Sequence, residues 1–335
     1  MKLAIVILNW NGKKFLEQFL PTLLKHTPEY AEVVVADNAS TDDSISFLKE
    51  CHPQVRILSN DRNYGFAEGY NLALEKVDAE YYCLLNSDIE VTEGWAESVI
   101  EMMESDPSIA AAQPKLRSLY HRESFEYAGA AGGFIDKYGY PFCRGRVFNT
   151  VEKDEGQYDT PIDIFWASGA ALFVRSRVYR ELGGLDADFF AHMEEIDLCW
   201  RIRNHGYRIV VQPQSVVYHV GGGTLPKNNS FKTFLNFRNN HFLLLKNLPG
   251  RRLFPTFLAR IVLDNVAAFS FLAQGHVKDF TAVYKAHWAV VKQFGKIKCK
   301  RDGHTGAYAA VWKRPILLEY HLFQHKKFNG SEFIK

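Results

Sequence analysis

Short apolar runs alternate with segments of helical spacing through the first hundred or so residues. The runs typical of buried strands are 4–8, 32–36, 55–58, 81–85 and 109–113. The segments between them that carry helical spacing or helix-start signals are 13–25, 40–50, 65–77 and 93–105. Strands that alternate with helices form a mostly parallel sheet with helices on both faces. The pattern therefore predicts an α/β domain.

The second part of the chain is patterned less regularly. Residues 127–145 are rich in glycine and aromatic side chains and predict a loop or hairpin excursion beside the sheet. Strand character returns at 162–174, with a break of small residues that begins at Ser168 and Gly169. Such a break either makes room for a substrate or marks a bulge. The remaining predicted elements are a helix at about 189–201 and strands at 207–211 and 216–220.

Polar side chains directly follow three of the predicted strands. Asn9 and Asn11 follow the first strand, Asp37 ends the second, and Asp88 comes shortly after the strand at 81–85. Ligands of open α/β sheets bind outside the carboxyl ends of the strands. These side chains therefore predict one polar crevice, although each acid could instead be a turn or capping residue.

The chemistry of these side chains suits a nucleotide with a metal ion. Asp88, preceded by Asn86 and Ser87, suits a hard divalent cation and the phosphate oxygens that accompany it. Asp37 is an acceptor for the N3–H of uracil or thymine.

A segment with two glycines opens the helix predicted between the two acids. Gly65 and Gly69 lie four residues apart, which permits a close approach of the backbone to a ligand, and Asn63 and Asn71 flank them. The dinucleotide fingerprint G-x-G-x-x-G does not follow the first strand.

Three acids crowd the first turn of the helix predicted near residue 194. Asp197 is spaced for an i,i+4 ion pair with Arg201. That pair does not explain Glu194 and Glu195, because adjacent carboxylates after an aromatic run repel each other and lose hydration. Such crowding tunes a carboxylate toward a general base, so all three acids are candidate catalytic residues.

A single histidine follows the last predicted strand run. His219 comes after a β-branched run and before three glycines, so we expect it at an exposed edge rather than in the core. A lone histidine is usually structural, but this one could complete a metal site with Asp88 or bind a diphosphate.

Composition narrows the class of protein. The chain has 335 residues, enough for one large domain or one domain with an extension, and its net charge of +2 argues against nucleic acid as the main partner. Its five cysteines lack C-x-x-C spacing, which disfavours zinc or disulfide frameworks and indicates a reducing compartment. The apolar run at 3–8 is too short for a signal peptide, so we expect a cytosolic protein.

After residue 225 the sequence becomes rich in Phe and Leu, with Arg and Lys interleaved. Helical segments are predicted at 231–247, 252–274 and 280–294. Arg260 and Asp264 interrupt the longest apolar run, which argues against a transmembrane span. Two interpretations stay open. One is an amphipathic extension on a membrane surface, with basic residues toward anionic headgroups: Lys232, Arg238, Lys246, Arg251 and Arg252. The other is a helical cap packed on the preceding domain or on a second subunit.

Together these motifs resemble those of family 2 glycosyltransferases of the GT-A fold, in the branch that includes bacterial rhamnosyltransferases. The matching segments are 6–12, 35–42, 63–71, 84–88, 194–198 and 219–224, in the family's order. The resemblance implies a Rossmann-like GT-A domain at 1–225 and a helical C-terminal extension at 226–335. The donor-binding part would be about 1–113 and the acceptor-side part about 114–225.

The resemblance also implies residue roles. Asp37 would hold the pyrimidine, Asp88 and His219 would hold Mg²⁺ or Mn²⁺ on the donor diphosphate, and Glu195 would be the base. The other donor-side candidates are Asn9, Asn11, Asn63, Gly65, Asn71, Asn86 and Ser87. The acceptor-side candidates are Trp166, Ser168 and Gly169.

Two positions depart from the family pattern. Asn86 stands where many members have Asp, which removes a negative charge from the expected metal site. Glu195 stands where Asp is usual, so its reach differs by one methylene, and Glu194 or Asp197 stays open as the base.

The implied activity is inverting transfer of a sugar from a UDP- or dTDP-linked donor, dTDP-rhamnose among them, to a hydroxyl of a glycan or lipid-linked acceptor in surface polysaccharide synthesis. The implied location is the cytoplasm, with attachment to the inner face of the plasma membrane and homodimer formation as alternatives. A sugar nucleotidyltransferase would need a glycine-rich basic loop after the first strand, which residues 9–12 lack. A non-catalytic nucleotide- or carbohydrate-binding protein is a third hypothesis, because Asn86 weakens the metal motif.

Overall fold

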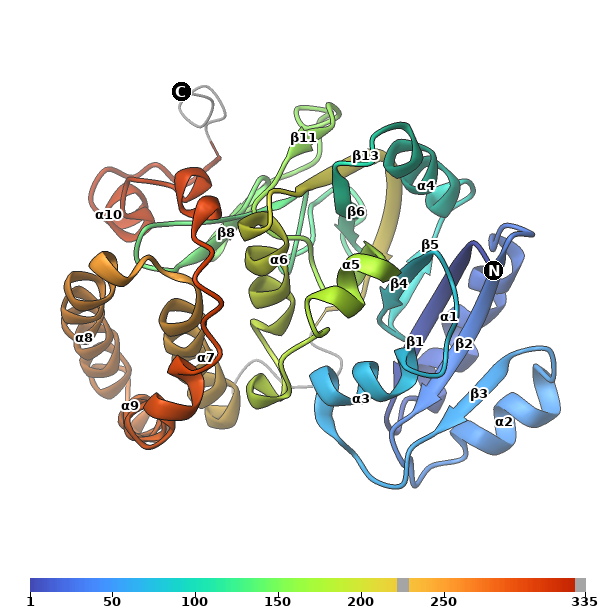
Figure 1. Cartoon of the computed structure of the whole chain (residues 1–335), viewed down its shortest axis with the longest axis horizontal. Coiled ribbons are helices and arrows are strands. Elements are labelled where there is room, and N and C mark those ends of the chain that lie inside the picture. The colour runs from blue at the N-terminus through green and yellow to red at the C-terminus, as the bar shows by residue number, and fades with distance from the viewer. Residues whose placement is uncertain (222–228, 329–335) are drawn as a thin grey trace.

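A nine-stranded sheet forms the centre of the structure, a computed structural model that describes residues 1–221 and 229–328 (Figure 1). Its strands are β1 (Leu3–Asn9), β2 (Ala31–Asp37), β3 (Arg56–Ser59), β4 (Tyr81–Leu85), β5 (Ile89–Val91), β6 (Ile109–Ser118), β11 (Ile162–Asp163), β12 (Ala171–Arg175) and β13 (Arg208–His219). The helices between them are α1 (Lys13–Lys25), α2 (Ser44–Cys51), α3 (Gly65–Leu74), α4 (Trp95–Ser105), α5 (Ser176–Glu181) and α6 (Glu194–Asn204).

The strand order explains where a site can form. It is β11-β13-β6-β12-β4-β1-β2-β3, with β5 paired to β13. Strands β1, β2, β3, β4, β6 and β13 run in one direction, whereas β5, β11 and β12 run antiparallel to the strands they pair with. The predicted mostly parallel sheet is confirmed. The carboxyl ends of the parallel strands and the amino end of β12 therefore meet at one edge, which we call the rim.

Alternate side chains of the central strands enter two separate apolar cores. In β1, Ile5 packs in a core with residues of α1, α2 and α4, whereas Val6 packs in a core with residues of α3, α5 and α6. This follows from the two-residue period of a strand. Because helices cover both faces, a run such as that of β4 is buried along its whole length.

The less regular middle of the chain folds into two features. The predicted excursion forms an antiparallel sheet of β7 (Gly133–Ile135), β8 (Pro141–Cys143), β9 (Arg146–Val147) and β10 (Thr150–Val151). The single strand predicted at 162–174 was wrong, since β11 pairs with β13 while β12 lies between β4 and β6. Conversely, the strands predicted at 207–211 and 216–220 form one strand, β13, with a register shift between Gln212 and Val216.

Helices α7 (Ser230–Asn247), α8 (Gly250–Ala273), α9 (Val277–Lys298) and α10 (Ile316–His321) form a layer at one end of the molecule (Figure 1). On α7, Phe242, Leu243 and Leu244 are buried in the same core as Ile196 of α6. This part of the extension therefore packs on the preceding domain without a core of its own. Residues 222–224 of the expected histidine–glycine motif lie outside the described residues.

Candidate active site

The rim gathers most of the polar side chains singled out in the sequence. Asn9 of β1 is registered opposite Asp37 of β2, and Leu85 of β4 lies opposite Ala171 of β12. The Asn86 N–H donates to the carbonyl oxygen of Ala170 (3.0 Å), which holds the loop after β4 against the start of β12. The loop after β1 lies beside the same place, because a Cβ at Gly12 would lie 3.6 Å from Ser87 Oγ.

Asp37 ties the first two loops of the rim together. Its carboxylate oxygens accept hydrogen bonds from the Asn9 side-chain amide (3.0 Å) and from the Ser40 N–H (2.9 Å). Asn11 Oδ1 accepts a further bond from the Thr41 N–H (2.7 Å). Each carboxylate oxygen has a second lone pair, so Asp37 can still accept a hydrogen bond from a ligand. The predicted donor-side residues Asn9 and Asn11 thus shape the loops around Asp37.

The loop before α3 is braced by the protein itself. Asn63 Oδ1 accepts hydrogen bonds from the Asn38 side chain (3.0 Å) and the Gly65 N–H (2.8 Å). Gly65 has a φ of +77°, and a Cβ there would lie 2.6 Å from the Phe190 ring. The Phe190 carbonyl oxygen accepts the Phe66 N–H (2.9 Å) at the start of α3. The segment before α6 therefore approaches the backbone closely at Gly65, and the expected approach of a donor there stays a prediction.

Asn71 is likewise bound by other parts of the chain. Its side-chain nitrogen donates to the Leu185 carbonyl (2.7 Å), and its oxygen accepts from the Tyr179 hydroxyl (2.7 Å) and the Leu185 N–H (3.0 Å). These bonds anchor α3 to the segment before α6. Asn71 thus ties these elements together, and its expected contact with a donor stays a prediction.

A histidine and two carboxylates form a buried cluster where β13 ends. His219 Nε2 lies 3.1 Å from Asp88 Oδ1, and His219 Nδ1 lies 3.4 Å from Glu126 Oε1. Burial alone would lower the pKa of His219, but the Glu126 and Asp88 carboxylates outweigh burial and raise that pKa to about 10. The expected pairing of His219 with Asp88 is present in the structure. The expected exposure of His219 was wrong, because the segment around Glu126 covers it.

Glu194 and Glu195 begin α6 with unsatisfied carboxylates. The Oε2 atom of each is buried and has no hydrogen-bond partner among the described residues. Burial raises the pKa of both carboxyls, and the neighbouring Glu195 adds to the effect on Glu194. A Cβ at Gly169 would lie 3.6 Å from Cβ and Cγ of Glu195 and 3.5 Å from the Phe66 ring. Glu195 therefore lies beside the amino end of β12, at the rim.

The backbone that leads into α6 has an uncommon conformation. Phe190, His192 and Met193 have φ values of +66°, +68° and +74°, in the left-handed region that side chains disfavour. His192 Nε2 is buried and has no partner in the part of the chain that the structure describes. Burial, aided by the charge of Lys232, lowers the pKa of His192 to about 4. Strain of this kind is held by surrounding contacts and is common at functional sites.

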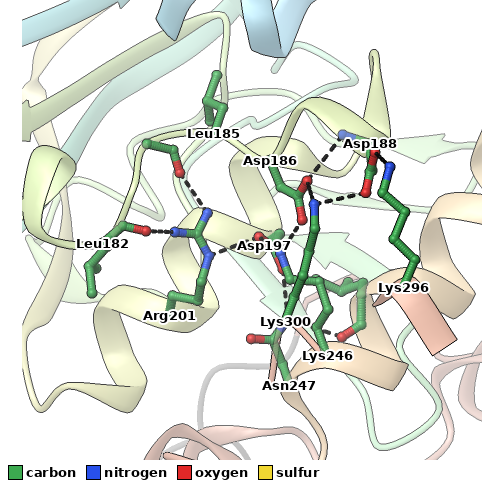
Figure 2. A network of polar contacts seen from close by, with 12 residues as sticks. Leu182, Leu185, Asp186, Asp188, Asp197, Arg201, Lys246, Asn247, Lys296 and Lys300 are labelled. Atoms are coloured by element: carbon green, nitrogen blue, oxygen red, sulfur yellow. Dashed lines mark hydrogen bonds and ion pairs between the residues drawn. The ribbon is translucent and has the colours of Figure 1, made fainter. Parts of the chain in front are cut away.

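Asp197, in contrast to the two glutamates, is fully paired. Its oxygens accept hydrogen bonds from Arg201 Nε (2.9 Å), Lys246 Nζ (2.7 Å) and Asn247 Nδ2 (2.8 Å), as Figure 2 shows. Burial alone would raise the pKa of Asp197, but Lys246 and Arg201 lower it. The predicted i,i+4 pair with Arg201 is confirmed. A carboxylate held by three donors is not available as a base, so Asp197 leaves the list of candidates.

The C-terminal extension holds the segment before α6 through lysines. Lys246 Nζ lies 2.6 Å from Asp186 Oδ2, and Lys300 Nζ lies 2.5 Å from Asp186 Oδ1 and 2.8 Å from Asp188 Oδ2. Lys296 Nζ lies 2.5 Å from Asp188 Oδ1 (Figure 2). The extension thereby fixes the approach to α6 and the position of its first turn.

Of the three expected acceptor-side residues, Trp166 and Ser168 make internal hydrogen bonds, and Gly169 lies next to Glu195. The indole of Trp166 donates to the Phe134 carbonyl (2.8 Å), and the Ser168 hydroxyl donates to the Ala128 carbonyl (2.5 Å). Both side chains are buried: Trp166 ties the segment before β12 to β7, and Ser168 ties it to the loop that precedes β7. Gly169 is the member of the set that adjoins Glu195.

Two residues of this arrangement were not assigned to it from the sequence. The expectation that Lys246 faces anionic headgroups was wrong, because its side chain is buried against Asp186 and Asp197. Glu126, which contacts His219, lies in a stretch without periodicity, and Lys246, which holds Asp197, lies 49 positions further along the chain. Neither carries a local signal, because only the fold brings it to its partner.

A cavity of about 600 Å³ lies away from these residues, lined by Asp78, Tyr81 and Arg175 among others. The Arg175 guanidinium donates to the Ile109 carbonyl (2.8 Å) and the Tyr81 hydroxyl (2.8 Å). Its charge is thus engaged in holding strands and helices together, and we assign this cavity no role in the site.

Solved structures of sugar-transferring enzymes share this fold. The mannosyltransferase PcManGT from Pyrobaculum calidifontis, in complex with GDP-Man and Mn²⁺, matches with a TM-score of 0.53 at 16% identity over 92% of this chain and 86% of that chain. S. aureus TarS with UDP-GlcNAc matches with a TM-score of 0.57 at 14% identity over 90% and 84%. GalNAc-T7 with UDP, GalNAc and Mn²⁺ matches with a TM-score of 0.59 at 16% identity over 75% of this chain, which spans 48% of that one. The fold is therefore of the GT-A type expected from the sequence.

Sequence comparison shows which family of proteins the chain belongs to. The profile described as glycosyl transferase family 2 matches residues 4–173, half of the chain, and the chain belongs to this family. N-acetylglucosaminyl-diphospho-decaprenol L-rhamnosyltransferase of Mycobacterium tuberculosis is 26% identical over 232 residues, 65% of this chain and 75% of the relative. The low-salt glycan biosynthesis hexosyltransferase Agl10 of Haloferax volcanii is 22% identical over 245 residues, 71% of this chain and 73% of the relative. The protein is a glycosyltransferase, as the motifs predicted.

Proposed function

We propose that this glycosyltransferase transfers a sugar, with inversion, from a UDP- or dTDP-linked donor to a hydroxyl of a glycan or lipid-linked acceptor. One observation carries the proposal: an unpartnered buried carboxylate, Glu195, and the Asp88–His219 pair flank the same end of β12. The first group suits proton removal from an alcohol, and the second suits the diphosphate end of a donor.

Asp88 and His219 fit a divalent cation such as Mg²⁺ or Mn²⁺. A carboxylate oxygen and a neutral imidazole nitrogen are both ligands for such ions, and binding of the ion would displace the proton that Asp88 and Glu126 favour on His219. Glu126 lies at the second nitrogen of His219, where a carboxylate typically orients a metal-binding histidine. When bound, the ion would neutralise charge on the departing nucleoside diphosphate. The Mn²⁺ named for two structures of this fold supports a divalent ion here.

The donor nucleotide would lie along the rim from Asp37 to Asp88. Asp37 would accept the N3–H of the pyrimidine with a free lone pair, while Asn9 and Asn11 hold the loops in place. Asn86 and Ser87 directly follow β4, the strand between β12 and β1 in the sheet, and would face the ribose and diphosphate.

Glu195 would act as the base. Its carboxylate would accept the proton of the acceptor hydroxyl as that oxygen attacks the anomeric carbon from the face opposite the diphosphate. The bond from that carbon to the diphosphate oxygen breaks, and the electron pair leaves with the oxygen, so the anomeric configuration inverts. A raised pKa improves a carboxylate as a proton acceptor, because a stronger base removes the hydroxyl proton more readily. Glu194 is the second candidate.

The relatives indicate the class of sugar and acceptor. The mycobacterial relative is named for transfer of L-rhamnose to a polyprenyl-linked N-acetylglucosamine, and another relative is an O-antigen biosynthesis protein of Myxococcus xanthus. We therefore propose dTDP-rhamnose as the first donor to test and a lipid-linked glycan as the acceptor. Such an acceptor would bring the protein to the cytoplasmic face of a membrane.

The test begins with calorimetry of UDP and dTDP, each with and without Mn²⁺ or Mg²⁺. We expect binding that strengthens with the metal, and a loss of that strengthening in Asp88→Ala. Consumption of a panel of sugar nucleotides then identifies the donor. Absence of binding by every nucleotide tested would contradict the proposal, and binding without any sugar release would favour a non-catalytic binding protein.

A further inference from the structure

Helix α8 has a largely polar buried face and an apolar exposed face, the opposite of an ordinary surface helix. Its buried stripe is largely polar and repeats every four residues as Thr256, Arg260, Asp264 and Ala268. Its outward side chains are apolar, and Phe254 and Val266 are 80% and 65% exposed. The other large apolar side chains exposed on α8 include Leu258, Ile261, Val262 and Phe269. A surface helix of a soluble protein normally faces the core with its apolar stripe, so this arrangement indicates a non-aqueous partner.

The polar stripe is satisfied inside the protein. The guanidinium of Arg260 donates to Asp264 Oδ1 (3.0 and 3.1 Å) and to the Tyr138 carbonyl (2.9 Å). His241 Nε2 of α7 and His287 Nε2 of α9 lie 2.7 and 3.0 Å from Asp264 Oδ2. Arg260 and Asp264 are thus paired on the side that faces α7 and α9. The other charged residues of α8 are Arg251 and Arg252 in its first turn, so the exposed apolar side chains beyond that turn are not interrupted by charge.

The apolar surface continues from α8 onto α9. The Phe269 and Phe280 rings lie 5.8 Å apart, and the Phe280 and Tyr284 rings lie 5.0 Å apart. The Tyr284 hydroxyl donates to Asn265 Oδ1 of α8 (2.8 Å). One turn further along α9, Trp288 is 60% exposed. The two helices therefore present one apolar face, which we call the α8–α9 face. Both helices lie at the end of the molecule away from the central sheet (Figure 1).

The charges around the α8–α9 face are mostly positive. Residues 250–301 contain ten lysines and arginines but only two acids. Of these acids, Asp264 is buried and Asp279 accepts a hydrogen bond from the Thr233 hydroxyl (2.6 Å).

A row of lysines borders the apolar residues of α9. Three lysines recur every seven residues, each directly after an exposed apolar residue. The pairs are Val277–Lys278, Tyr284–Lys285 and Val291–Lys292. Over residues 1–221 and 229–328 none of these lysines forms an ion pair, and Lys292 Nζ lies 5.4 Å from the Trp288 ring centre. The lysines are therefore available to an external anion.

We propose that the α8–α9 face docks on an anionic lipid surface, with its apolar side chains in the acyl region and the lysine row at the headgroups. Apolar burial and cationic attraction are the two contributions that hold such helices in a membrane interface. The inference rests on this face alone and does not depend on the proposed sugar transfer.

Two other occupants fit less well. By length and composition α8 could cross a membrane, with a mean hydropathy of 1.5, but its Arg260 and Asp264 are bound to other parts of the chain. We therefore place α8 along the membrane surface. A second copy of the chain would bring like-charged lysine rows together, which disfavours association.

The test is flotation of the full-length protein with vesicles of phosphatidylcholine alone or of equal parts phosphatidylcholine and phosphatidylglycerol. We expect binding to the mixed vesicles that weakens as salt is raised, and little binding to the neutral ones. Removing Lys278 and Lys285 as K278Q and K285Q should weaken binding roughly fivefold for each lysine. Phe269→Glu with Trp288→Glu should weaken it at least about tenfold, because two aromatic side chains lose their apolar environment.

The matched control is Tyr120→Glu, which changes an exposed aromatic residue (71%) outside the extension. We expect it to bind vesicles as the unaltered protein does, and thermal unfolding checks that all variants are folded. The proposal is overturned if the unaltered protein does not float with the mixed vesicles, or if the control loses as much binding as the double variant. It is also overturned if Trp288→Glu converts a dimer to a monomer, or if alkaline carbonate fails to release the protein from vesicles.

Discussion

At the scale of single residues, two carboxyl groups of α6 have pKa values shifted in opposite directions. Asp197 is surrounded by donors, and Lys246 and Arg201 lower its pKa. Glu195 begins the same helix with an unpartnered oxygen, and burial raises its pKa. Two acids whose environments move their pKa values apart usually have different roles. Asp197 therefore supports the helix, and Glu195, with Glu194 as the second candidate, is the acid that we propose as the base.

Glu195→Gln is expected to lower kcat by about 10²- to 10⁴-fold, the usual contribution of a general base. Its binding of UDP, measured by calorimetry, should be unchanged, because the proposed mechanism puts this side chain on the acceptor side of the reacting carbon. Glu50→Gln, an exposed substitution on α2, is the control and should leave kcat unaltered. If Glu195→Gln keeps the full transfer rate, the assignment fails and Glu194 becomes the base to test.

The pH profile of the unaltered enzyme tests the same assignment. The active form of the base is ionised, and burial raises its pKa above the ordinary 4.5. Activity should therefore rise with pH along an acid limb that lies above pH 4.5, since the carboxyl is protonated below that limb. An acid limb of kcat/KM at or below 4.5 would argue against a buried carboxylate as the base.

Glu126 is expected to act through His219. Its carboxylate lies 3.4 Å from His219 Nδ1 and would orient the imidazole for a metal ion at Nε2. Glu126→Gln should weaken Mn²⁺ affinity by about 10- to 100-fold, as outer partners of metal ligands commonly do. Titration of Mn²⁺ in the presence of UDP measures this, and binding of UDP without metal is the control. Unchanged Mn²⁺ affinity would reduce Glu126 to a packing residue.

Most acids that the structure places at the rim could be named from the sequence, but not which of them are bound by other parts of the chain. Asp37, Asp88 and Glu195 stand out because acids follow apolar strands or crowd a helix start. Asn71 stands in an equally suggestive motif, yet its side chain is consumed by Leu185 and Tyr179. Sequence does not show which way a polar side chain points, and that direction decides between a ligand contact and an internal tie.

At the scale of elements, α6 is positioned by helices far from it in sequence. Lys246 of α7 joins Asp197 and Asp186, all three with buried side chains. Removing one partner of such a network leaves buried charge without compensation, at a cost of about 3–5 kcal/mol. The network therefore matters both for stability and for the placement of the first turn of α6.

Lys246→Met should lower the free energy of unfolding by roughly that amount, about 3–5 kcal/mol, in urea titration followed by circular dichroism. Lys14→Met makes the same replacement at an exposed position on α1 and should change it by less than about 0.5 kcal/mol. Equal effects of the two substitutions would show that the network contributes little.

The elements themselves were well predicted where periodicity was strong. Each of β1 to β4 and α1 to α4 falls within a few residues of its expected range. The strand at 162–174 was not, because Ser168 and Gly169 turn the chain from one part of the sheet to another. An apolar run shows that a segment is buried, but its strand partners depend on the rest of the sheet.

At the scale of the whole molecule, the family match and the folded unit differ in extent. The family profile ends at residue 173, yet α6 lies beyond it, and α7 adds Phe242, Leu243 and Leu244 to the same core. The boundary near 225 remains a prediction about chain organisation. This boundary separates two domains only if residues 1–228 can fold without the helices that follow.

A chain that ends at residue 228 is expected to aggregate or to unfold without a cooperative transition. It would expose the core positions covered by α7 and would leave Asp197 without Lys246 and Asn247. Size-exclusion chromatography and thermal melting measure this against the full chain. A soluble, cooperatively melting fragment would show instead that the extension is a separate domain.

The sequence by itself determined the α/β class, the order of the main elements, the family and the acids of the rim. These depend on local periodicity and short motifs, which a chain carries whatever its final contacts. Only the tertiary structure decided that Asp197 is a buried support, that Glu126 contacts His219, and that α8 turns its polar stripe inward. Each of these depends on side chains distant in sequence, and the free energy of a buried charge or an exposed apolar face is set by the partners that the fold supplies.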